Sequence, residues 1–441
     1  MRLATTTLLL ALAATAATAQ DLLPKAPPQR TAVVIRNAVI HPVSAPTIER
    51  GFVVFADGRI TAVGSGDPPL VEAETIDAEG AHVYPGLIGA STGLGLAEHG
   101  AVRATRDEDE VGAVTPEVRA AVAVNPDSTL FPVARLNGLL VAATFPTGGA
   151  IPGRVSVLRL DGWTWESMAI DDAAALLVEW PRTRPIRAWW MDQSDEEQMD
   201  EATKRRAAVT EAFTAAEAYG KARAADGSMP VDLRWEAMLP FLPSSDGKRG
   251  KPIFVEANDL DQIVEAVSFA VDRNLNLVLV GGRDARGCLD RLKKHDVPVI
   301  VTGTVGMPKR DDSPFDDPFT LPRDLEAAGV RWCLATGERL GNERNLPYDA
   351  ARAAAFGLDR AAALRSITLS AAEILGIDER YGSLEKGKSA TLIVTTGDPM
   401  EITTQVRRAF IDGREIRLES KQTALAEKYR TKYGQLKDSE K

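Results

Sequence analysis

Short apolar runs at both ends of the chain predict β-structure. Near the start, TAVVIRNAVIHPV, RGFVVFADGRITAVG and ETIDAEGAHVYPG are rich in β-branched residues and are separated by turn dipeptides such as Asp57-Gly58 and Glu79-Gly80. Near the end, GSLEKGKSATLIVTTGDP and VRRAFIDGREIRL show the same pattern. The two blocks predict one small β-sandwich composed of residues 30–83 and 383–420.

Between these blocks, apolar strands alternate with amphipathic helices. KPIFVEAN precedes DLDQIVEAVSFAVDRN, LNLVLVGG precedes RDARGCLDRLKKHD, and VPVIVTG precedes LPRDLEAAGVRWCLATG. Such β–α units are typical of a parallel sheet that is buried on both faces. Residues 84–382 suffice for a barrel of roughly 250 residues with insertions. The sequence therefore predicts an α/β fold with a distorted TIM (β/α)8 barrel. A doubly wound sheet uses similar units, but no Gly-rich phosphate fingerprint follows the first strand.

Two segments depart from this alternation. Residues from about 181 to 228 are rich in charge and alanine, with helical spacing in their second half, which predicts a helical insertion in the barrel. Trp189 and Trp190 within it either cap the barrel rim, face a partner, or are ordinary surface aromatics. Residues 421–441 predict an amphipathic C-terminal helix that ends in a charged tail.

The first residues of the chain have the composition of a secretory signal peptide. A Leu- and Ala-rich run follows Arg2 and ends in an Ala-x-Ala cleavage pattern, so residues 1–19 predict export. We therefore expect a secreted or periplasmic protein. No later segment is a long charge-free apolar run, and no membrane span is expected after signal removal.

Charge and cysteine content narrow the function classes. The formal net charge is −10, which argues against nucleic acid or anionic membrane as the main partner. Cys288 and Cys333 lie among apolar or helix-like neighbours, so we expect buried free thiols. No CxxC and no Cys/His zinc spacing occurs in the sequence.

Two further stretches carry a family resemblance. HVYPGLIGASTGLGLAE resembles the opening motif of the amidohydrolase superfamily, especially its imidazolonepropionase-like branch, which reads PG-[LF]-I-D-x-H-x-H at the end of the first barrel strand. Residues 342–402 resemble the closing signature, with an A-x-x-L-G turn followed by Gly-Ser-Leu-Glu-x-Gly-Lys. The resemblance implies a barrel that holds zinc or another divalent metal at the carboxyl ends of its strands. It also implies metal-activated water that attacks a C–N bond, often in a cyclic amide or dipeptide.

The ligand positions of that family are altered in this sequence. The two first-strand histidines fall on Ser91 and Gly93, and the aspartate before them falls on Gly89. A glycine has no donor side chain and a neutral hydroxyl is a poor zinc ligand. The chain has four histidines, and none lies at an expected ligand position, although the loop residue His99 is near the first strand. They are His41, His82, His99 and His295.

Three carboxylates are the candidate catalytic residues. Glu256 belongs to the fifth-strand segment, Asp284 follows the sixth, and Glu338 follows the last. Because the strand ends of a barrel converge, these carboxylates could together hold a hard cation. Alternatively, Arg283 and Arg339 could neutralise them as ion pairs.

Two functions follow from this sequence. The first is an exported amidohydrolase-like pseudoenzyme that has lost metal-dependent hydrolysis, with no metal or cofactor expected. It would bind a small molecule or act as a partner subunit, either as a homodimer or as a heterodimer with an intact amidohydrolase relative. The alternative is an active hydrolase of carbon–nitrogen bonds, in non-peptide or cyclic amide and dipeptide substrates, with a remodelled site at Glu256, Asp284 and Glu338. Metal content and chelator-sensitive activity separate the two.

Overall fold

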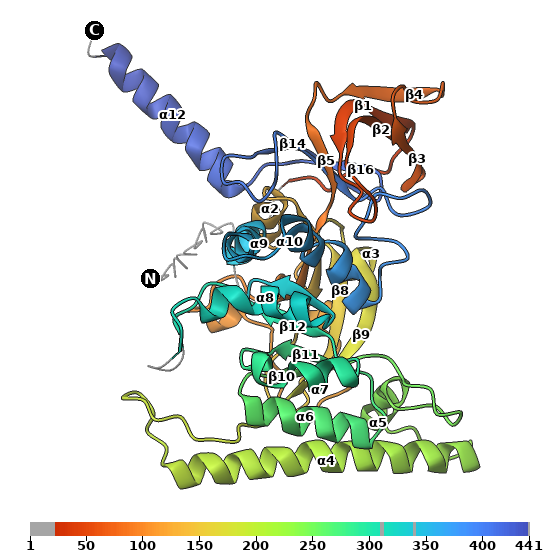
Figure 1. Cartoon of the computed structure of the whole chain (residues 1–441), viewed down its shortest axis with the longest axis vertical. Coiled ribbons are helices and arrows are strands. Elements are labelled where there is room, and N and C mark those ends of the chain that lie inside the picture. Colours follow the sequence, from red (N-terminus) through yellow and green to blue (C-terminus); the bar gives the residue numbers. More distant parts are fainter. Residues whose placement is uncertain (1–22, 309–312, 338–340, 440–441) are drawn as a thin grey trace, which may run out of the picture.

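Two eight-stranded sheets organise the molecule (Figure 1). The computed structural model describes residues 23–308, 313–337 and 341–439, so the predicted signal peptide at 1–19 and the candidate Glu338 lie outside the described residues. Over these ranges, no helix combines the length and the apolar character that a membrane span needs.

The first sheet joins the two ends of the chain. Its order is β16-β15-β14-β5-β1-β2-β3, and β4 also pairs with β1. Its strands are β1 Ala32–Ile40, β2 Ile48–Ala56, β3 Arg59–Ser65, β4 Ala73–Asp77, β5 His82–Pro85, β14 Leu392–Thr395, β15 Val406–Ile411 and β16 Arg414–Ile416. The antiparallel β5–β14 ladder, from Pro85–Leu392 to His82–Thr395, is where the N- and C-terminal strands meet.

This composite sheet folds over on itself like a sandwich. Phe55 on β2 and Phe410 on β15 are separated in the strand order, yet their ring centroids lie 5.1 Å apart, edge to face, within one buried cluster. The β2–β3 turn has positive φ at both Asp57 (50°) and Gly58 (76°). That conformation suits a tight hairpin and agrees with the turn predicted from the sequence.

The second sheet forms a near-closed barrel. Its order is β13-β12-β11-β10-β9-β8-β7-β6, and the outer strands β13 and β6 lie against each other. The strands are β6 Leu87–Thr92, β7 Leu139–Thr144, β8 Gly153–Arg159, β9 Ala169–Glu179, β10 Ile253–Ala257, β11 Leu277–Gly281, β12 Val299–Thr302 and β13 Trp332–Ala335. Neighbouring strands are parallel except around β8, which runs antiparallel to β7 and β9. The predicted fold class, a distorted barrel with a composite β-unit, is confirmed.

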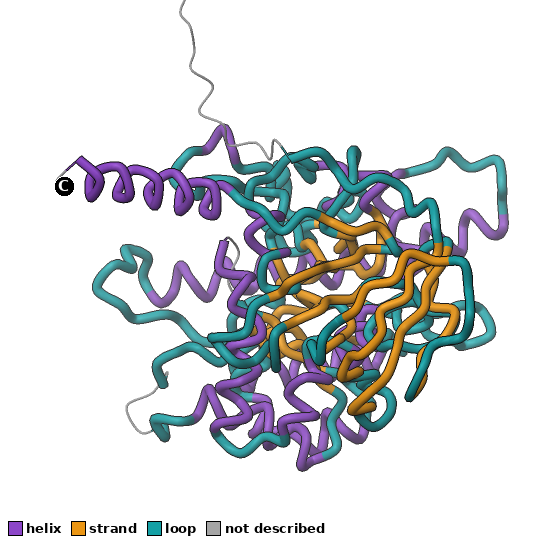
Figure 2. The backbone as a smooth tube through the Cα atoms, turned by 90° about the horizontal axis from the view of Figure 1, so that it is seen from above, coloured by secondary structure: helices purple, strands orange, loops and turns teal. Residues whose placement is uncertain are grey.

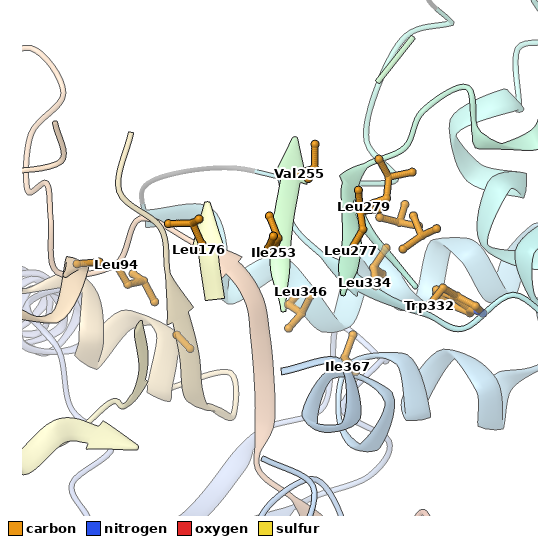
Figure 3. Close-up of a cluster of buried hydrophobic side chains, with 14 of the residues drawn as sticks. Leu94, Leu176, Ile253, Val255, Leu277, Leu279, Trp332, Leu334, Leu346 and Ile367 are labelled. Atoms are coloured by element: carbon orange, nitrogen blue, oxygen red, sulfur yellow. The ribbon is translucent and has the colours of Figure 1, made fainter. Parts of the chain in front are cut away.

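Alternate residues of the barrel strands belong to two different cores. On β10, Phe254 faces the barrel interior, whereas Ile253 and Val255 face the surrounding helices. The outer core is shown in Figure 3, where Leu346 and Ile367 from the helical layer accompany the outward side chains of the strands. This strict alternation decides which residues at the strand ends point into the mouth of the barrel.

Helices cover the parallel part of the barrel and leave one long helix projecting. The helices are α1 Ala120–Ala123, α2 Leu130–Arg135, α3 Trp165–Met168, α4 Asp195–Ala225, α5 Leu233–Met238, α6 Leu260–Asp272, α7 Leu289–Lys294, α8 Asp317–Ala328, α9 Leu346–Ala355, α10 Arg360–Ser366, α11 Leu369–Leu375 and α12 Lys421–Ser439, with 3-10 turns η1 Arg103–Thr105, η2 Leu239–Phe241, η3 Ala285–Cys288 and η4 Gly341–Asn345. The 31-residue α4 starts at a capping box formed by Ser194 and Glu197. In both whole-chain views α12 extends away from the body (Figures 1 and 2).

Buried ionic contacts join the barrel to the composite sheet. The Asp161 carboxylate accepts hydrogen bonds from the guanidinium groups of Arg135 and Arg414, each at 2.9 Å. Nearby, Arg159 of β8 pairs with Asp412 in the β15–β16 turn. Ser389 and Tyr381 donate further hydrogen bonds to that carboxylate, at 2.5 and 3.1 Å. These contacts fix the composite sheet at the amino end of the barrel.

Candidate functional site

A small pocket of about 150 Å³ lies at the carboxyl ends of the barrel strands. Six of the eight barrel strands or their following loops contribute to it. Its lining residues are Ser91, Thr92, Gly93, Glu108, Phe145, Thr147, Glu256, Asn258, Val280, Gly281, Thr302 and Gly337. Parallel barrels carry their active sites at this end, so the pocket is the candidate functional site.

Strand alternation explains why these side chains face the pocket. Phe254 faces the barrel interior, and Glu256 lies two residues further along β10 on the same face. The same spacing places Thr302 after the interior residue Ile300 of β12. Gly337 likewise follows Ala335, so the last strand has no side chain at its mouth position.

A long loop after β6 brings a second carboxylate to the pocket. Glu108 accepts the backbone N–H of Thr147 at its carbonyl oxygen (2.6 Å), which fixes this loop beside the end of β7. Its carboxylate pairs with Arg106 at 2.5 Å. Sequence reasoning missed Glu108; the only signal was the acidic run Arg-Asp-Glu-Asp-Glu in the first loop, which does not tell which member turns inward.

The pocket adjoins a much larger cleft of about 1430 Å³. Glu256 and Asn258 line both spaces. The outer wall comes from residues 180–205, including Trp190 and the start of α4, and the inner wall from the loops after β10 and β11. A ligand could therefore extend from the barrel mouth outward into the cleft.

Charged side chains in the cleft are extensively paired. Arg283 contacts Asp259 at 2.6 Å and Asp284 at 3.7 Å. Arg184 pairs with Asp261 at 2.6 Å. These contacts agree with the ion-pair alternative for Asp284. The backbone N–H of Leu260 also donates to the Asp284 carboxylate, at 3.3 Å.

The predicted site residues are only partly brought together. Glu256 and Asp284 both line the cleft, but only Glu256 also lines the mouth pocket. Asp284 comes after the turn at Gly281 and Gly282, where the strand has ended, and so lies further out. Glu338 lies outside the described residues, and Gly337 before it lines the pocket.

At Gly281 and Gly89, neighbouring atoms leave no room for a side chain. Gly281 has φ of +95°, and a Cβ atom there would lie 2.5 Å from Oδ1 of Asn258. Ser91 and Gly93, the positions aligned with the family's first histidines, both line the pocket. Gly89, aligned with the preceding aspartate, is buried within β6, and a Cβ there would lie 2.8 Å from Thr92 Cγ2.

The donor set at the mouth does not fit the family's metal centre. Imidazole is the usual zinc donor there, but the pocket offers hydroxyls, one amide and the carboxylates Glu108 and Glu256. Among the described residues, no group of three or more His, Cys, Asp or Glu side chains is arranged to hold a metal ion. The side chains that the structure describes at the mouth therefore support no chemical step that runs through a metal.

The histidines lie elsewhere in the fold. His41 and His82 are 2.9 Å apart (Nε2 to Nδ1) in the composite sheet, where Tyr84 stacks on His41. Burial, and then the neighbouring His82, lower the pKa of His41 to about 4. His99 is exposed in the loop after β6, and His295 follows α7. None of the four lines the pocket or the cleft.

One buried carboxylate near the site was also missed. Glu343 in η4 is almost fully buried, and its Oε2 accepts a hydrogen bond from Thr336 Oγ1 at 2.6 Å. Thr336 directly follows β13, so this contact anchors the last strand end. Its neighbours in the sequence are polar, and nothing in that pattern predicts burial.

Comparisons with known proteins agree with this barrel and its closing segment. The family model described as "Amidohydrolase family" matches residues 261–416. The imidazolonepropionase of Symbiobacterium thermophilum is 25% identical over 380 residues, covering 79% of this chain and 84% of that protein. Amidohydrolase tasK of Hapsidospora irregularis is 21% identical over 400 residues, covering 83% of this chain but 39% of that longer protein.

A solved structure shows the same fold. The crystal structure of an amidohydrolase from Thermotoga maritima MSB8 superimposes with a TM-score of 0.76 at 24% identity, covering 87% of this chain and 99% of that one. Residues 261–416 thus match the amidohydrolase family, and the remainder of the barrel shares the fold of that solved amidohydrolase. Over most of its length the chain is distantly similar to imidazolonepropionase.

Proposed function

We propose that this protein binds a small polar ligand in the barrel mouth and does not perform the metal-dependent hydrolysis implied by its superfamily. One observation supports this proposal most directly. The mouth positions aligned with the family's first-strand histidines are occupied by Ser91 and Gly93, which still line an open pocket. A catalytic zinc needs three protein ligands, usually including imidazole, and these side chains supply none.

The shape of the two spaces suggests the kind of ligand. The inner pocket accepts a small hydrogen-bonding group beside Ser91, Thr302 and Asn258, with Phe145 as an apolar wall. The outer cleft has room for a larger body, and its rim carries arginine and carboxylate side chains. Because both spaces share Glu256, we expect this carboxylate to contact the bound ligand.

Export and partnership are further parts of the proposal. The signal-like residues 1–19 support a secreted or periplasmic location. We also propose that the protein acts as a partner subunit, either as a homodimer or as a heterodimer with an intact amidohydrolase relative. In the heterodimer, this chain would bind the ligand and the intact relative would hydrolyse it.

A remodelled hydrolase of carbon–nitrogen bonds is the second candidate. The observation that favours it is the presence of Glu108 and Glu256 in the same pocket. A carboxylate at the mouth could act as a general base toward a bound water.

Metal analysis and an activity screen distinguish the two functions. The protein is purified without chelator, its metal content is measured by mass spectrometry, and hydrolysis of cyclic amides and dipeptides is assayed with and without EDTA. We expect metal far below one ion per chain and no turnover above background. Hydrolysis that EDTA abolishes would contradict the proposal, and EDTA-resistant hydrolysis that is lost in Glu256→Gln would favour the second candidate.

Ligand binding is tested by thermal shift with the same compounds. A ligand present at 100 times its Kd should stabilise the fold by about 2.7 kcal/mol. Glu256→Gln should reduce this stabilisation. Glu415→Gln is the matched control, because Glu415 is on β16, pairs with Arg408 and lines neither space. If no compound stabilises the native protein, or if both variants respond alike, the binding site has been wrongly assigned.

A further inference from the structure

The C-terminal helix α12 carries an uncovered aromatic face. Tyr429 and Tyr433 are 48% and 58% exposed, and their spacing of four places them on one side of the helix with Leu425. Every described side chain from Lys421 to Gln435 is exposed. The helix extends away from the body in both whole-chain views (Figures 1 and 2).

Among the described residues, the hydrogen bonds and ion pairs of this helix are local. Ser420 and Thr423 exchange hydrogen bonds at its start, and Arg430 pairs with Glu427 along its surface. Lys432 lies over the rings of both tyrosines, at 5.9 and 5.8 Å from their centroids. In proteins, most helical stability comes from packing of one face against a neighbour. A partner that covers the tyrosine face would supply that packing.

The charge of the helix indicates an acidic partner. The α12 sequence contains five Lys and Arg residues and two acidic ones, so its net charge is +3, whereas the whole chain carries −10. The rest of the chain therefore carries −13. A second copy of this chain is such an acidic surface.

One segment of the body complements the helix: it has exposed aromatic side chains and a negative charge. Trp189 and Trp190, 96% and 56% exposed, directly precede the acidic start of α4. The acidic side chains there are Asp192, Asp195, Glu196, Glu197, Asp200 and Glu201. Hydrogen bonds from the backbone and hydroxyl of Ser194 lower the pKa of Glu197, so this carboxylate stays ionised. Exposed aromatics surrounded by charge are typical of interaction surfaces.

The two surfaces lie at opposite ends of the molecule. In Figure 1, α12 projects from one end of the long axis and α4 runs across the other. Helix α12 and the segment before α4 therefore do not touch within one chain. Two copies packed antiparallel about a two-fold axis would form the same contact twice and close the assembly.

We propose that α12 of one copy docks on the segment Trp189–Glu201 of a second copy, and that the protein is an antiparallel homodimer in solution. The tyrosine face packs on the two tryptophans while the Lys and Arg side chains meet the acidic start of α4. The docking segment also contributes Trp190 and Glu201 to the wall of the outer cleft, so the interface adjoins the proposed ligand site. Association measured without any ligand tests the dimer separately from the proposed binding function.

Association of the full mature chain is measured by sedimentation at low and high salt. We expect a dimer whose dissociation constant rises at least tenfold in the variant Lys428→Glu/Arg430→Glu/Lys432→Glu. The matched control is Arg50→Glu/Lys386→Glu/Arg407→Glu, an equal charge change on exposed residues outside α12 and its start, and its dimer should be retained. A monomer at every concentration, or equal weakening by both variants, would overturn the proposal.

Cross-linking tests the partner surface directly. Equal amounts of a Tyr429→Cys variant and a Trp189→Cys variant are mixed and mildly oxidised. A disulfide-linked pair containing one of each should form, and it should be absent when either variant is mixed with the parent protein. The parent is a sound background because Cys333 is fully buried and burial raises the pKa of Cys288. A dimer without this cross-link would place the interface elsewhere and contradict the proposal. Binding of monomeric protein to vesicles of anionic phospholipid would instead assign the helix to a membrane surface, which also contradicts the proposal.

Discussion

The two ends of the barrel differ in how their polar groups are used. At the amino end, Asp161 and Asp412 are held by guanidinium groups and hydroxyls, and these contacts join the barrel to the composite sheet. At the carboxyl end, Ser91, Gly93 and Gly337 surround an open pocket. The fold is thus stabilised at the end that has no candidate chemistry. This separation means that residues at the mouth can change while the contacts that hold the barrel to the composite sheet stay in place.

The largest expected effect comes from removing the most buried carboxylate of the amino end. The Asp161 and Arg135 side chains are 3% and 4% exposed, so Asp161→Ala leaves buried guanidinium charge without this partner. Loss of one member of such a pair costs about 3–5 kcal/mol. Urea unfolding of both proteins measures the change. Asp261→Ala, at the solvent-exposed pair with Arg184, is the control and should cost less than about 1 kcal/mol.

A smaller, pH-dependent effect is expected at Asp412. Burial raises the pKa of this carboxyl, but Arg159 and the hydrogen bonds from Ser389 and Tyr381 outweigh burial and leave it below its usual range. We expect Asp412→Asn to reduce the free energy of unfolding by about 1–3 kcal/mol at neutral pH.

The sign of the pH dependence follows from the lowered pKa of Asp412. Its contribution is complete above the ordinary aspartate pKa of about 3.9 and is lost as pH falls through the lower folded value. The stability difference between Asp412→Asn and the native protein should therefore narrow below about pH 4. A difference that stays constant from pH 6 to pH 3 would mean that the charge of Asp412 does not stabilise the junction.

At the carboxyl end, a comparable deletion should have almost no effect. The Ser91 hydroxyl makes no hydrogen bond within the described part of the chain, so Ser91→Ala should change the free energy of unfolding by less than about 0.5 kcal/mol. The same urea titration measures it. A loss above 1 kcal/mol would show that the mouth also stabilises the fold and would remove the contrast between the two ends.

Restoring the first-strand histidines should have the smallest effect on activity. In Ser91→His/Gly93→His we expect hydrolysis of cyclic amides and dipeptides, with zinc added, to stay at background. Two imidazoles do not complete a catalytic zinc site, and no third imidazole lines the described pocket. Of the two carboxylates that line it, Glu108 is already paired with Arg106. Zinc-dependent turnover in the double variant would show that the remaining ligands are present after all.

Local rules predicted the parts of the fold that depend on neighbours in sequence. The turn at Asp57 and Gly58 follows from residues that tolerate positive φ, and the interior positions of β10 follow from a period of two. The closing signature at residues 342–402 also falls within the matched segment 261–416. These features are encoded over a few residues each, so a single sequence reveals them.

Features that depend on distant partners were not predictable. The sequence of β8, Gly153–Arg159, does not indicate that this strand runs antiparallel to its neighbours. The pattern of apolar residues predicts a strand but not its direction. Glu108 reaches the mouth only because its backbone pairs with Thr147, about 40 residues later. Of the predicted carboxylates, Glu256 follows from strand alternation. Asp284 was assigned to the site only from its place after a strand, and it lines the outer cleft but not the mouth pocket.

The β5–β14 ladder has a consequence for how the chain is made. It pairs Val83 with Val394, about 310 residues later, so a ribosome or export channel delivers β5 long before its partner. Until then the backbone N–H and C=O groups on that edge of β5 are unpaired and can form hydrogen bonds with strands of other chains. Long-range pairings of this kind form slowly and leave intermediates prone to aggregation. Final closure of the composite sheet must therefore await release of the last residues, and chains truncated before Leu392 should be targets for chaperones and proteases.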